Sequence, residues 1–207
     1  MTHEEQPRPE NEESQPGANP EHAEYEHPEI WIGSLADYNN GDLHGDWMDA
    51  ARKPEEIHAD IQRILASGPA ARRGETPEEW GIFDHQGFGP LQLGEYERIE
   101  EVSRLAQAIA THGPAFAVFA NDRVCDSEEA TVERFRESYL GRYDSVVDYA
   151  RQLASDLGFD DALDELRRDV RSYAKIDYEL FAHDLQFGGD IIYAHSDEGG
   201  IYIFRND

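Results

Sequence analysis

Negative charge is the feature that most constrains how this chain folds. Its 207 residues include 45 Asp and Glu against 18 Lys and Arg, which gives a formal net charge of −27. Like charges repel one another when a chain compacts, so this excess works against folding. A stable fold does not need such an imbalance, and we therefore expect it to serve a purpose outside fold stability.

Several explanations of the charge are open. It could be a solubility device, a halophilic surface, an acidic disordered tail or an imitation of DNA. Duplex DNA carries one negative charge per roughly 1.7 Å of axis, so two copies of this chain carry the charge of about 27 base pairs. Imitation of DNA is therefore an open hypothesis, together with the simpler explanations of the charge.

An acidic tail accounts for only part of the charge. Residues 1–29 are rich in Pro, Glu, Gln and Asn and contain little that could be buried. This composition predicts disorder, because burial cannot offset the entropy lost on ordering. The segment holds roughly eight of the net negative charges, a share too small to explain the total. The remaining body is still strongly acidic.

Composition also narrows the cellular setting. Cys125 is the only cysteine, which excludes an internal disulfide and favours a reducing compartment. No apolar run approaches the length of a membrane span, and the acidic start is unlike a signal peptide. We therefore expect a cytoplasmic protein. Acidic residues are interleaved with the basic ones, so we expect no binding to nucleic acid through a basic patch.

The N-terminal part of the body predicts strands around one helix. Pro54, followed by two Glu residues, is typical of a helix start, and Gly68 of a helix end. Apolar residues at helical spacing support this helix. The three strands are expected at 30–35, 45–50 and 79–84, with a turn-rich loop at 37–42.

From Glu95 onward the pattern is mainly helical. An apolar stripe predicts a helix formed by Tyr96, Ile99, Val102, Leu105, Ala106 and Ile109. The short apolar run 115–119 is ambiguous between helix and strand. A further helix is expected to begin at Asp126 or Ser127, with Val132, Phe135 and Tyr139 facing inward. Another is expected from the cap at Asp144–Ser145 to Gly158. Two more are expected over 160–170 and 176–187. A hairpin is expected from strands 191–195 and 201–204, which flank a glycine-containing loop.

These elements predict an α+β protein built as an elongated chain of small subdomains. An N-terminal α+β unit is followed by a central helical unit and by C-terminal helices with a β-hairpin. The expected divisions are the tail 1–29 and the subdomains 30–90, 91–125 and 126–207.

No catalytic motif is present. The sequence lacks paired Cys or His at zinc-binding spacing, a calcium loop, a phosphate-binding glycine loop, a dinucleotide fingerprint and a nucleophile elbow. Cys125 is interpreted as a small, partly buried residue and His44 as a turn or core histidine. We expect a protein that is not an enzyme, with no cofactor and no metal.

Carboxylates at three- and four-residue spacing on the expected helices form the candidate binding surface. A charge run is usually a solvated face, but here the excess persists along the whole body. The candidate acidic residues are Glu128, Glu129, Glu133, Glu137, Asp144, Asp148, Asp156, Asp160, Asp161, Asp164 and Glu165.

Several stretches resemble one known family. The segment 30–47 resembles the N-terminal signature of the ArdA antirestriction proteins, as does Glu78–Asp84 with Gly87–Gly89. Further on, Phe135–Ser145 is similar to the antirestriction motif region of that family, and Ile176–Ala182 to the part that follows. The resemblance runs from about Pro28 to the C-terminus. The acidic tail lies outside it.

The resemblance implies a DNA mimic carried by mobile elements. It implies inhibition of type I restriction-modification enzymes through occupation of their DNA-binding groove, by an elongated, curved homodimer. It places the dimer contact in the antirestriction motif region, with Phe135, Tyr139, Leu140 and Tyr143 as candidates. Two other hypotheses stay open: an acidic protein that sequesters a different basic DNA-binding partner, and a hydrolase with a carboxylate-bound metal.

Overall fold

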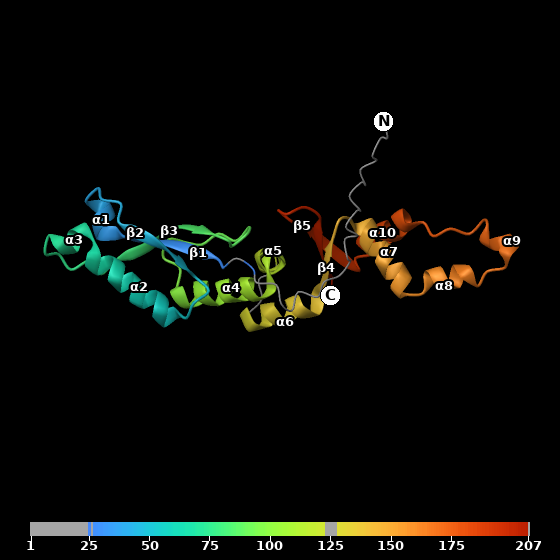
Figure 1. The fold of residues 1–207 in the computed structure, drawn as a ribbon, viewed down its shortest axis with the longest axis horizontal. Helices are drawn as coiled ribbons and strands as arrows, with labels where there is room; N and C mark the ends of the chain where they lie inside the picture. The colour runs from blue at the N-terminus through green and yellow to red at the C-terminus, as the bar shows by residue number, and fades with distance from the viewer. Residues whose placement is uncertain (1–24, 26, 123–127, 207) are drawn as a thin grey trace, which may run out of the picture.

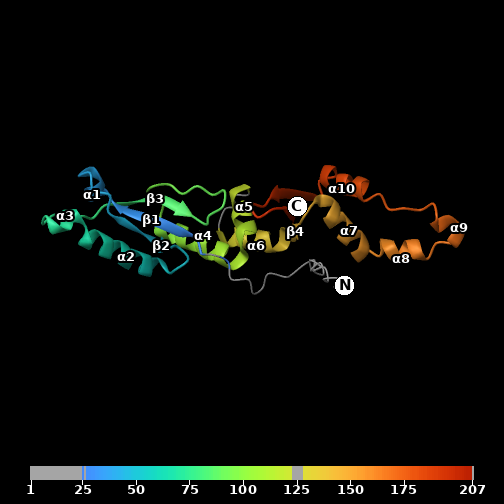
Figure 2. The same cartoon turned by 45° about the horizontal axis from the view of Figure 1, so that its top comes forward.

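The computed structural model describes residue 25 and residues 27–122 and 128–206. The protein is an elongated α+β structure with two small antiparallel sheets, one in each half (Figure 1). Three helices, α4 (Ile99–His112), α5 (Pro114–Asp122) and α6 (Glu128–Ser138), lie between the two sheets along the long axis. The same arrangement is seen after rotation (Figure 2). This confirms the expected fold class.

The N-terminal sheet contains the three predicted strands. Its order is β2-β1-β3, with antiparallel pairing throughout. The inward side chains of β1, Ile30 and Ile32, are fully buried. The strands are β1 (Glu29–Ser34), β2 (Gly45–Asp49) and β3 (Trp80–Gln86).

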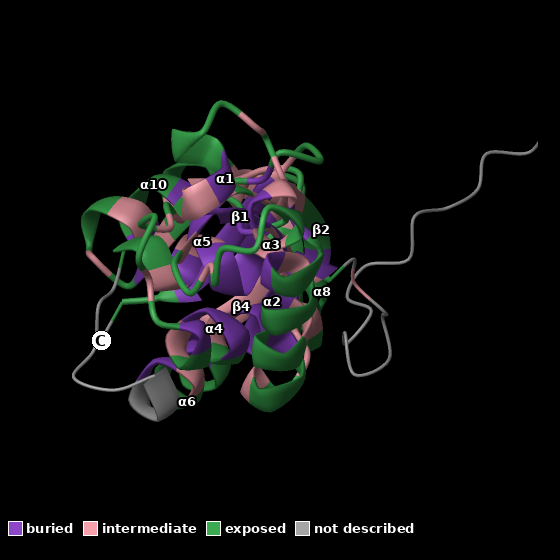
Figure 3. Cartoon of the chain, turned by 90° about the vertical axis from the view of Figure 1, so that its left-hand side faces the viewer, coloured by how far each residue is buried: buried purple, intermediate pink, exposed green. Residues whose placement is uncertain are grey.

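One long helix covers this sheet. Helix α2 (Pro54–Ser67) begins at Pro54 and is followed by Gly68 at its C-cap, as predicted. Its apolar face, with Ile57, Ile61 and Leu65, is buried. Seen along the long axis, the exposed face of α2 points outward and buried residues fill the middle (Figure 3).

The predicted loop 37–42 is partly helical. Helix α1 (Leu35–Asn39) starts there because the Ser34 hydroxyl accepts a hydrogen bond from the Asp37 N–H at 3.3 Å, which satisfies a free donor of the first turn. A second short helix, α3 (Pro69–Arg72), follows α2. The ring Nε2 of His44 lies 2.9 Å from the Ile64 carbonyl, so His44 connects this loop to α2.

Two helices form the central part. Helix α4 (Ile99–His112) begins three residues after Tyr96, the first residue of the predicted stripe, and Tyr96 is 71% exposed rather than buried. The other stripe residues do face the core or its edge. Helix α5 (Pro114–Asp122) resolves the ambiguous apolar run as a helix.

The next segment contains a strand that the sequence analysis missed. Helix α6 (Glu128–Ser138) ends before Tyr139, and its predicted start at Asp126 or Ser127 lies outside the described residues. Strand β4 (Tyr139–Tyr143) follows directly, so Tyr139 belongs to a strand rather than to the helix. Gly141 and a register irregularity break the usual alternation of β4.

The C-terminal part completes the second sheet, whose order is β4-β6-β5. The predicted hairpin is confirmed, and so is the helix capped by Ser145. The predicted helix 160–170 is instead split into two short helices. The elements are α7 (Val146–Asp156), α8 (Phe159–Asp164), α9 (Arg168–Arg171), α10 (Tyr178–Phe187), β5 (Ile191–His195) and β6 (Ile201–Arg205).

Two hydrophobic clusters stabilise the molecule. The larger one contains the N-terminal sheet, α2, α4 and α5, and extends to Phe135, Tyr202 and Phe204 of the C-terminal part. The smaller one lies between α7, α10 and the second sheet. The predicted subdomain boundaries at 90 and 125 stay predictions.

An aromatic cluster joins the two halves. Phe135 of α6 stacks on Tyr139 of β4 at a centroid distance of 5.0 Å and meets Phe116 and Phe119 of α5 edge-on at 5.4 and 5.6 Å. Phe204 of β6 packs against Phe119 at 5.4 Å. Such pairs contribute about 0.5–1.5 kcal/mol each beyond the area they bury. The cluster therefore holds the halves at a defined relative position.

Candidate functional surface

Exposed carboxylates line the outer face of α6. Glu133 and Glu137 are exposed and lie four residues apart. At 1.5 Å per residue this spacing is about 6 Å along the helix, close to two phosphate steps of about 3.4 Å on one DNA strand. Glu128 and Glu129 lie in the first turn of the same helix, but their side chains are outside the described part of the structure.

Two of the predicted carboxylates, one in the turn after β4 and one in the first turn of α7, differ in environment. Asp144 is exposed. Asp148 is half-buried and accepts a hydrogen bond of 2.6 Å from the Ser145 hydroxyl, which caps α7. Asp148 also forms an ion pair of 2.9 Å with Arg151. Its charge is therefore used partly within the chain, whereas that of Asp144 faces solvent.

Helix α8 and the end of α7 carry the remaining candidates, all of them exposed. Asp164 forms an ion pair with Arg171. Asp156 and Asp160 accept hydrogen bonds from the neutral side chains of Gln152 and Tyr178. Within the described residues, the predicted carboxylates that face solvent without an ion-pair partner are Glu133, Glu137, Asp144, Asp156, Asp160, Asp161 and Glu165.

The N-terminal half also carries an acidic surface, which the predicted candidate residues do not include. Residues 29–122 contain 17 Asp and Glu against 7 Lys and Arg, and residues 128–206 contain 18 against 9. The two halves therefore carry nearly equal net charge. A count of charge by region would have found this signal. Exposed carboxylates of the N-terminal half that form no ion pair with a described residue are Asp46, Glu55, Glu56, Glu78, Glu79, Asp84 and Glu95.

The four candidate contact residues of the antirestriction motif region are packed to different degrees. Phe135 is 3% exposed and belongs to the aromatic cluster of its own chain. Tyr139, Leu140 and Tyr143 are half-buried on β4. Burial raises the pKa of the Tyr139 and Tyr143 hydroxyls above the ordinary value. Strand β4 is an edge of its sheet, with one side of its backbone unpaired in that sheet.

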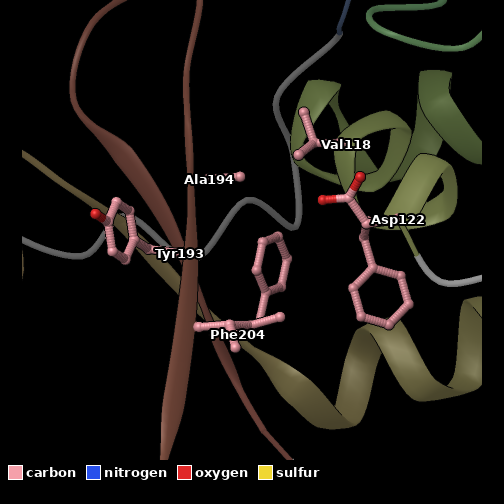
Figure 4. Close-up of a pocket in the computed structure, with 7 residues that line it drawn as sticks. Val118, Asp122, Tyr193, Ala194 and Phe204 are labelled. Atoms are coloured by element: carbon pink, nitrogen blue, oxygen red, sulfur yellow. The ribbon is translucent and has the colours of Figure 1, made fainter. Parts of the chain in front are cut away.

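A small pocket lies where α5 meets the second sheet. Val118 and Asp122 of α5 face Ala194 and Phe204 across it (Figure 4). Its volume is about 20 Å³, which is room for about one water molecule. This pocket is therefore too small to hold a substrate.

The described residues hold no group of three or more His, Cys, Asp or Glu side chains placed to bind a metal ion. In the same part of the chain, no helix combines the length and the apolar character that crossing a bilayer requires.

The fold and its surface define an elongated acidic protein whose charge is spread over both halves. Comparison with protein families gives a match over residues 30–198 to the model described as antirestriction protein (ArdA). The chain therefore belongs to the ArdA family of antirestriction proteins, a non-catalytic family, and the resemblance seen in the sequence is confirmed. A search of curated proteins found no match.

Proposed function

We propose that this protein is a DNA mimic that inhibits type I restriction-modification enzymes by occupying their DNA-binding groove. The observation that carries the proposal is the distribution of charge. Both halves of an elongated body have a similar excess of carboxylates, and many of these are exposed without an ion-pair partner among the described residues. The proposed setting is the cytoplasm of a cell that receives a mobile genetic element.

The proposed mechanism is electrostatic. A groove that binds DNA presents Lys and Arg side chains to the phosphates. Exposed carboxylates at comparable spacing can accept charge-assisted hydrogen bonds from the same cations. Counterions are released when the two charged surfaces meet, and long-range attraction speeds their encounter.

Rigidity supports this mechanism. Carboxylates on helices that are fixed by a packed core keep their spacing, so the partner does not have to order them on binding. The aromatic cluster around Phe135 links the two halves through packed rings. The acidic surfaces of both halves are therefore presented as one unit.

We further propose that the inhibitor is a homodimer. A second copy would extend the mimic toward the length of a two-part DNA site. The proposed contact is the β4 edge, with Tyr139, Leu140 and Tyr143 as its apolar residues and Phe135 supporting Tyr139 from the core. An apolar contact is needed there because two chains of charge −27 repel each other.

A competition experiment tests the function. Fluorescent duplex DNA is bound to a purified type I enzyme, and the protein is titrated in. We expect competitive displacement with the same inhibition constant for a duplex that contains the recognition sequence and for one that lacks it, after correction for the affinity of each duplex. Inhibition of cleavage without displacement of DNA would contradict occupation of the groove.

A control separates this function from the sequestration of another basic partner. The same titration is run with a basic nucleoid protein bound to the same DNA. Displacement of that protein, with the restriction enzyme unaffected, would favour the alternative that the acidic surface serves a different partner.

A further inference from the structure

The first described residue shows where residues 1–24 join the folded body. The ring of Tyr25 lies directly against Gly113, where an added Cβ atom would come within 2.5 Å of it. Burial raises the pKa of the Tyr25 hydroxyl, and the nearby Tyr202 and Glu198 raise it further. Tyr202 is in β6 and Glu198 is in the loop before it. The chain therefore enters beside the C-terminal sheet, although β1 lies in the N-terminal one.

A basic segment lies at the end of this same half. We call residues 166–175, Leu-Arg-Arg-Asp-Val-Arg-Ser-Tyr-Ala-Lys, the basic tip. It has four basic residues against one acidic residue, which makes it the most positive stretch of its length in the chain. It includes α9, which lies at the end of the long axis opposite to α1 and α3 (Figures 1 and 2).

Part of the positive charge of the basic tip is not neutralised within the described structure. Arg167 pairs with Asp169 at 2.8 Å, and Arg171 pairs with Asp164. Arg168 and Lys175 are exposed and form no ion pair with a described residue. Such a surface does not fit a positive DNA-binding groove.

Apolar side chains lie among these cations. Leu166, Val170 and Tyr173 are 38%, 47% and 89% exposed. The unpaired cations beside these side chains favour an acidic partner.

Residues 1–24 have the complementary charge and are attached to the same molecule. They contain seven Glu and one Arg. Twenty-four residues span up to about 80 Å when extended. The chain leads from the second sheet to the basic tip through α7 and α8, whose 11 and 6 residues rise only about 16 and 9 Å. The extended segment is longer than these two helices together. A tethered segment acts at an effective concentration of about millimolar, well above that of a free partner.

We propose that residues 1–24 cover the basic tip of their own chain, with their Glu side chains pairing with Arg168 and Lys175. This contact shields the basic tip from the acidic surface of other copies. A contact between the basic tip of one copy and the acidic surface of the next would be heterologous. Such a contact need not close into a ring, and it would then continue from copy to copy as open-ended association. The acidic segment therefore keeps an otherwise self-complementary chain from polymerising.

The test uses the full chain with a spin label. Cys125 is replaced by Ser, and Ser14→Cys carries the label in isotope-labelled protein. We expect the amide signals of residues 166–175 to broaden at low salt and to recover at high salt. Arg168→Glu with Lys175→Glu should abolish the broadening. The matched control is Lys53→Glu with Arg72→Glu, two exposed cations of the N-terminal half, which should leave it unchanged.

Mixed samples separate contacts within a chain from contacts between chains. Spin-labelled chains without isotope are combined with isotope-labelled chains without spin label. In this mixture no isotope-labelled chain carries a spin label, so broadening of the basic tip here would overturn the proposal in favour of a second copy. Absence of broadening in both samples would overturn it outright.

A second measurement tests the shielding. In the full chain, the seven Glu residues of residues 1–24 are replaced by Gln. Sedimentation at low salt should then show association that grows with concentration and that Arg168→Glu with Lys175→Glu reverses. Unchanged sedimentation of the Gln variant would contradict the shielding.

Discussion

At the scale of single residues, Asp37 shows how this chain uses a carboxylate inside its core. Asp37 is fully buried, and one carboxylate oxygen accepts a hydrogen bond of 2.5 Å from the Ala70 N–H. Burial by itself raises the pKa of this carboxyl. The Ser34 hydroxyl, the Ala70 N–H, His44 and Arg73 outweigh that effect and hold the pKa below its ordinary value. Asp37 is thus a charged residue that holds α1 against α3.

The lowered pKa predicts the sign of a pH effect on stability. An unfolded Asp has a pKa of about 3.9. The stabilisation by ionised Asp37 is therefore complete above that pH and is lost as pH falls through the lower, folded-state pKa. We expect Asp37→Asn to lower the free energy of unfolding by about 1–3 kcal/mol at neutral pH. Urea unfolding should show the difference shrinking toward pH 3.

The control for this prediction is Asp46→Asn. Asp46 is exposed and forms no ion pair with a described residue, so this change should have little effect at any pH. A difference between wild type and Asp37→Asn that stays constant from pH 7 to pH 3 would show that the charge of Asp37 contributes nothing.

At the scale of elements, the helices sort their carboxylates into two groups. Asp148 of α7 accepts a hydrogen bond from the capping Ser145 and pairs with Arg151, whereas Glu133 and Glu137 of α6 face solvent. Both groups look alike in a count of acidic residues, but only the solvent-facing group is available to a partner. The orientation of each helix on its core decides which carboxylate belongs to which group.

This division predicts how inhibition responds to neutralisation. An exposed ion pair contributes about 0.2–1 kcal/mol, so Glu133→Gln alone should weaken inhibition of a type I enzyme less than about fivefold. Combining it with Glu137→Gln, Asp144→Asn and Asp156→Asn should weaken it cumulatively. The measurement is the inhibition constant, with circular dichroism to verify the fold.

The matched control neutralises carboxylates that are already paired. Asp148→Asn with Asp164→Asn should weaken inhibition less than two of the solvent-facing changes. A single substitution that abolishes inhibition in folded protein would instead reveal a discrete site. It would contradict a mechanism in which binding is distributed over many carboxylates.

At the scale of the whole molecule, the two halves carry nearly equal negative charge and are joined by an aromatic cluster. A long surface of this kind makes many weak contacts rather than a few strong ones. Its binding to a positive groove should therefore depend on ionic strength more than on any one residue.

Salt dependence is the measurement at this scale. We expect the inhibition constant for a type I enzyme to rise steeply between about 50 and 200 mM monovalent salt, because released counterions oppose binding at higher salt. The affinity of the enzyme for DNA is measured in parallel, since it also falls. An inhibition constant that is insensitive to salt would argue against mimicry.

The proposed dimer makes a separate prediction. Leu140→Ala should shift the monomer–dimer equilibrium toward monomer, because Leu140 lies on the β4 edge. Light scattering over a concentration series at moderate salt measures the shift. Leu157→Ala, which truncates a leucine that is 59% exposed elsewhere, should leave the equilibrium unchanged. A wild-type protein that is monomeric at micromolar concentration would contradict the dimer.

The sequence alone predicted the elements whose signals are local. Proline and glycine at its ends and an apolar face at helical spacing predict α2, and the glycine-containing loop predicts the β5–β6 hairpin. The family was also recognisable, because its motifs occur in order along the chain. The overall acidity followed from a count of residues.

Features that depend on contacts between distant residues become visible only once the chain is folded. Strand β4 exists because β6, some sixty residues later, supplies its hydrogen-bond partners, and its glycine and irregular register conceal it in the sequence. Phe135 is a core residue because α5 and β6 bring aromatic rings to it. Asp148 and Asp164 are partly neutralised because they form ion pairs with nearby arginines. Burial and pairing arise from packing, which a sequence pattern does not contain.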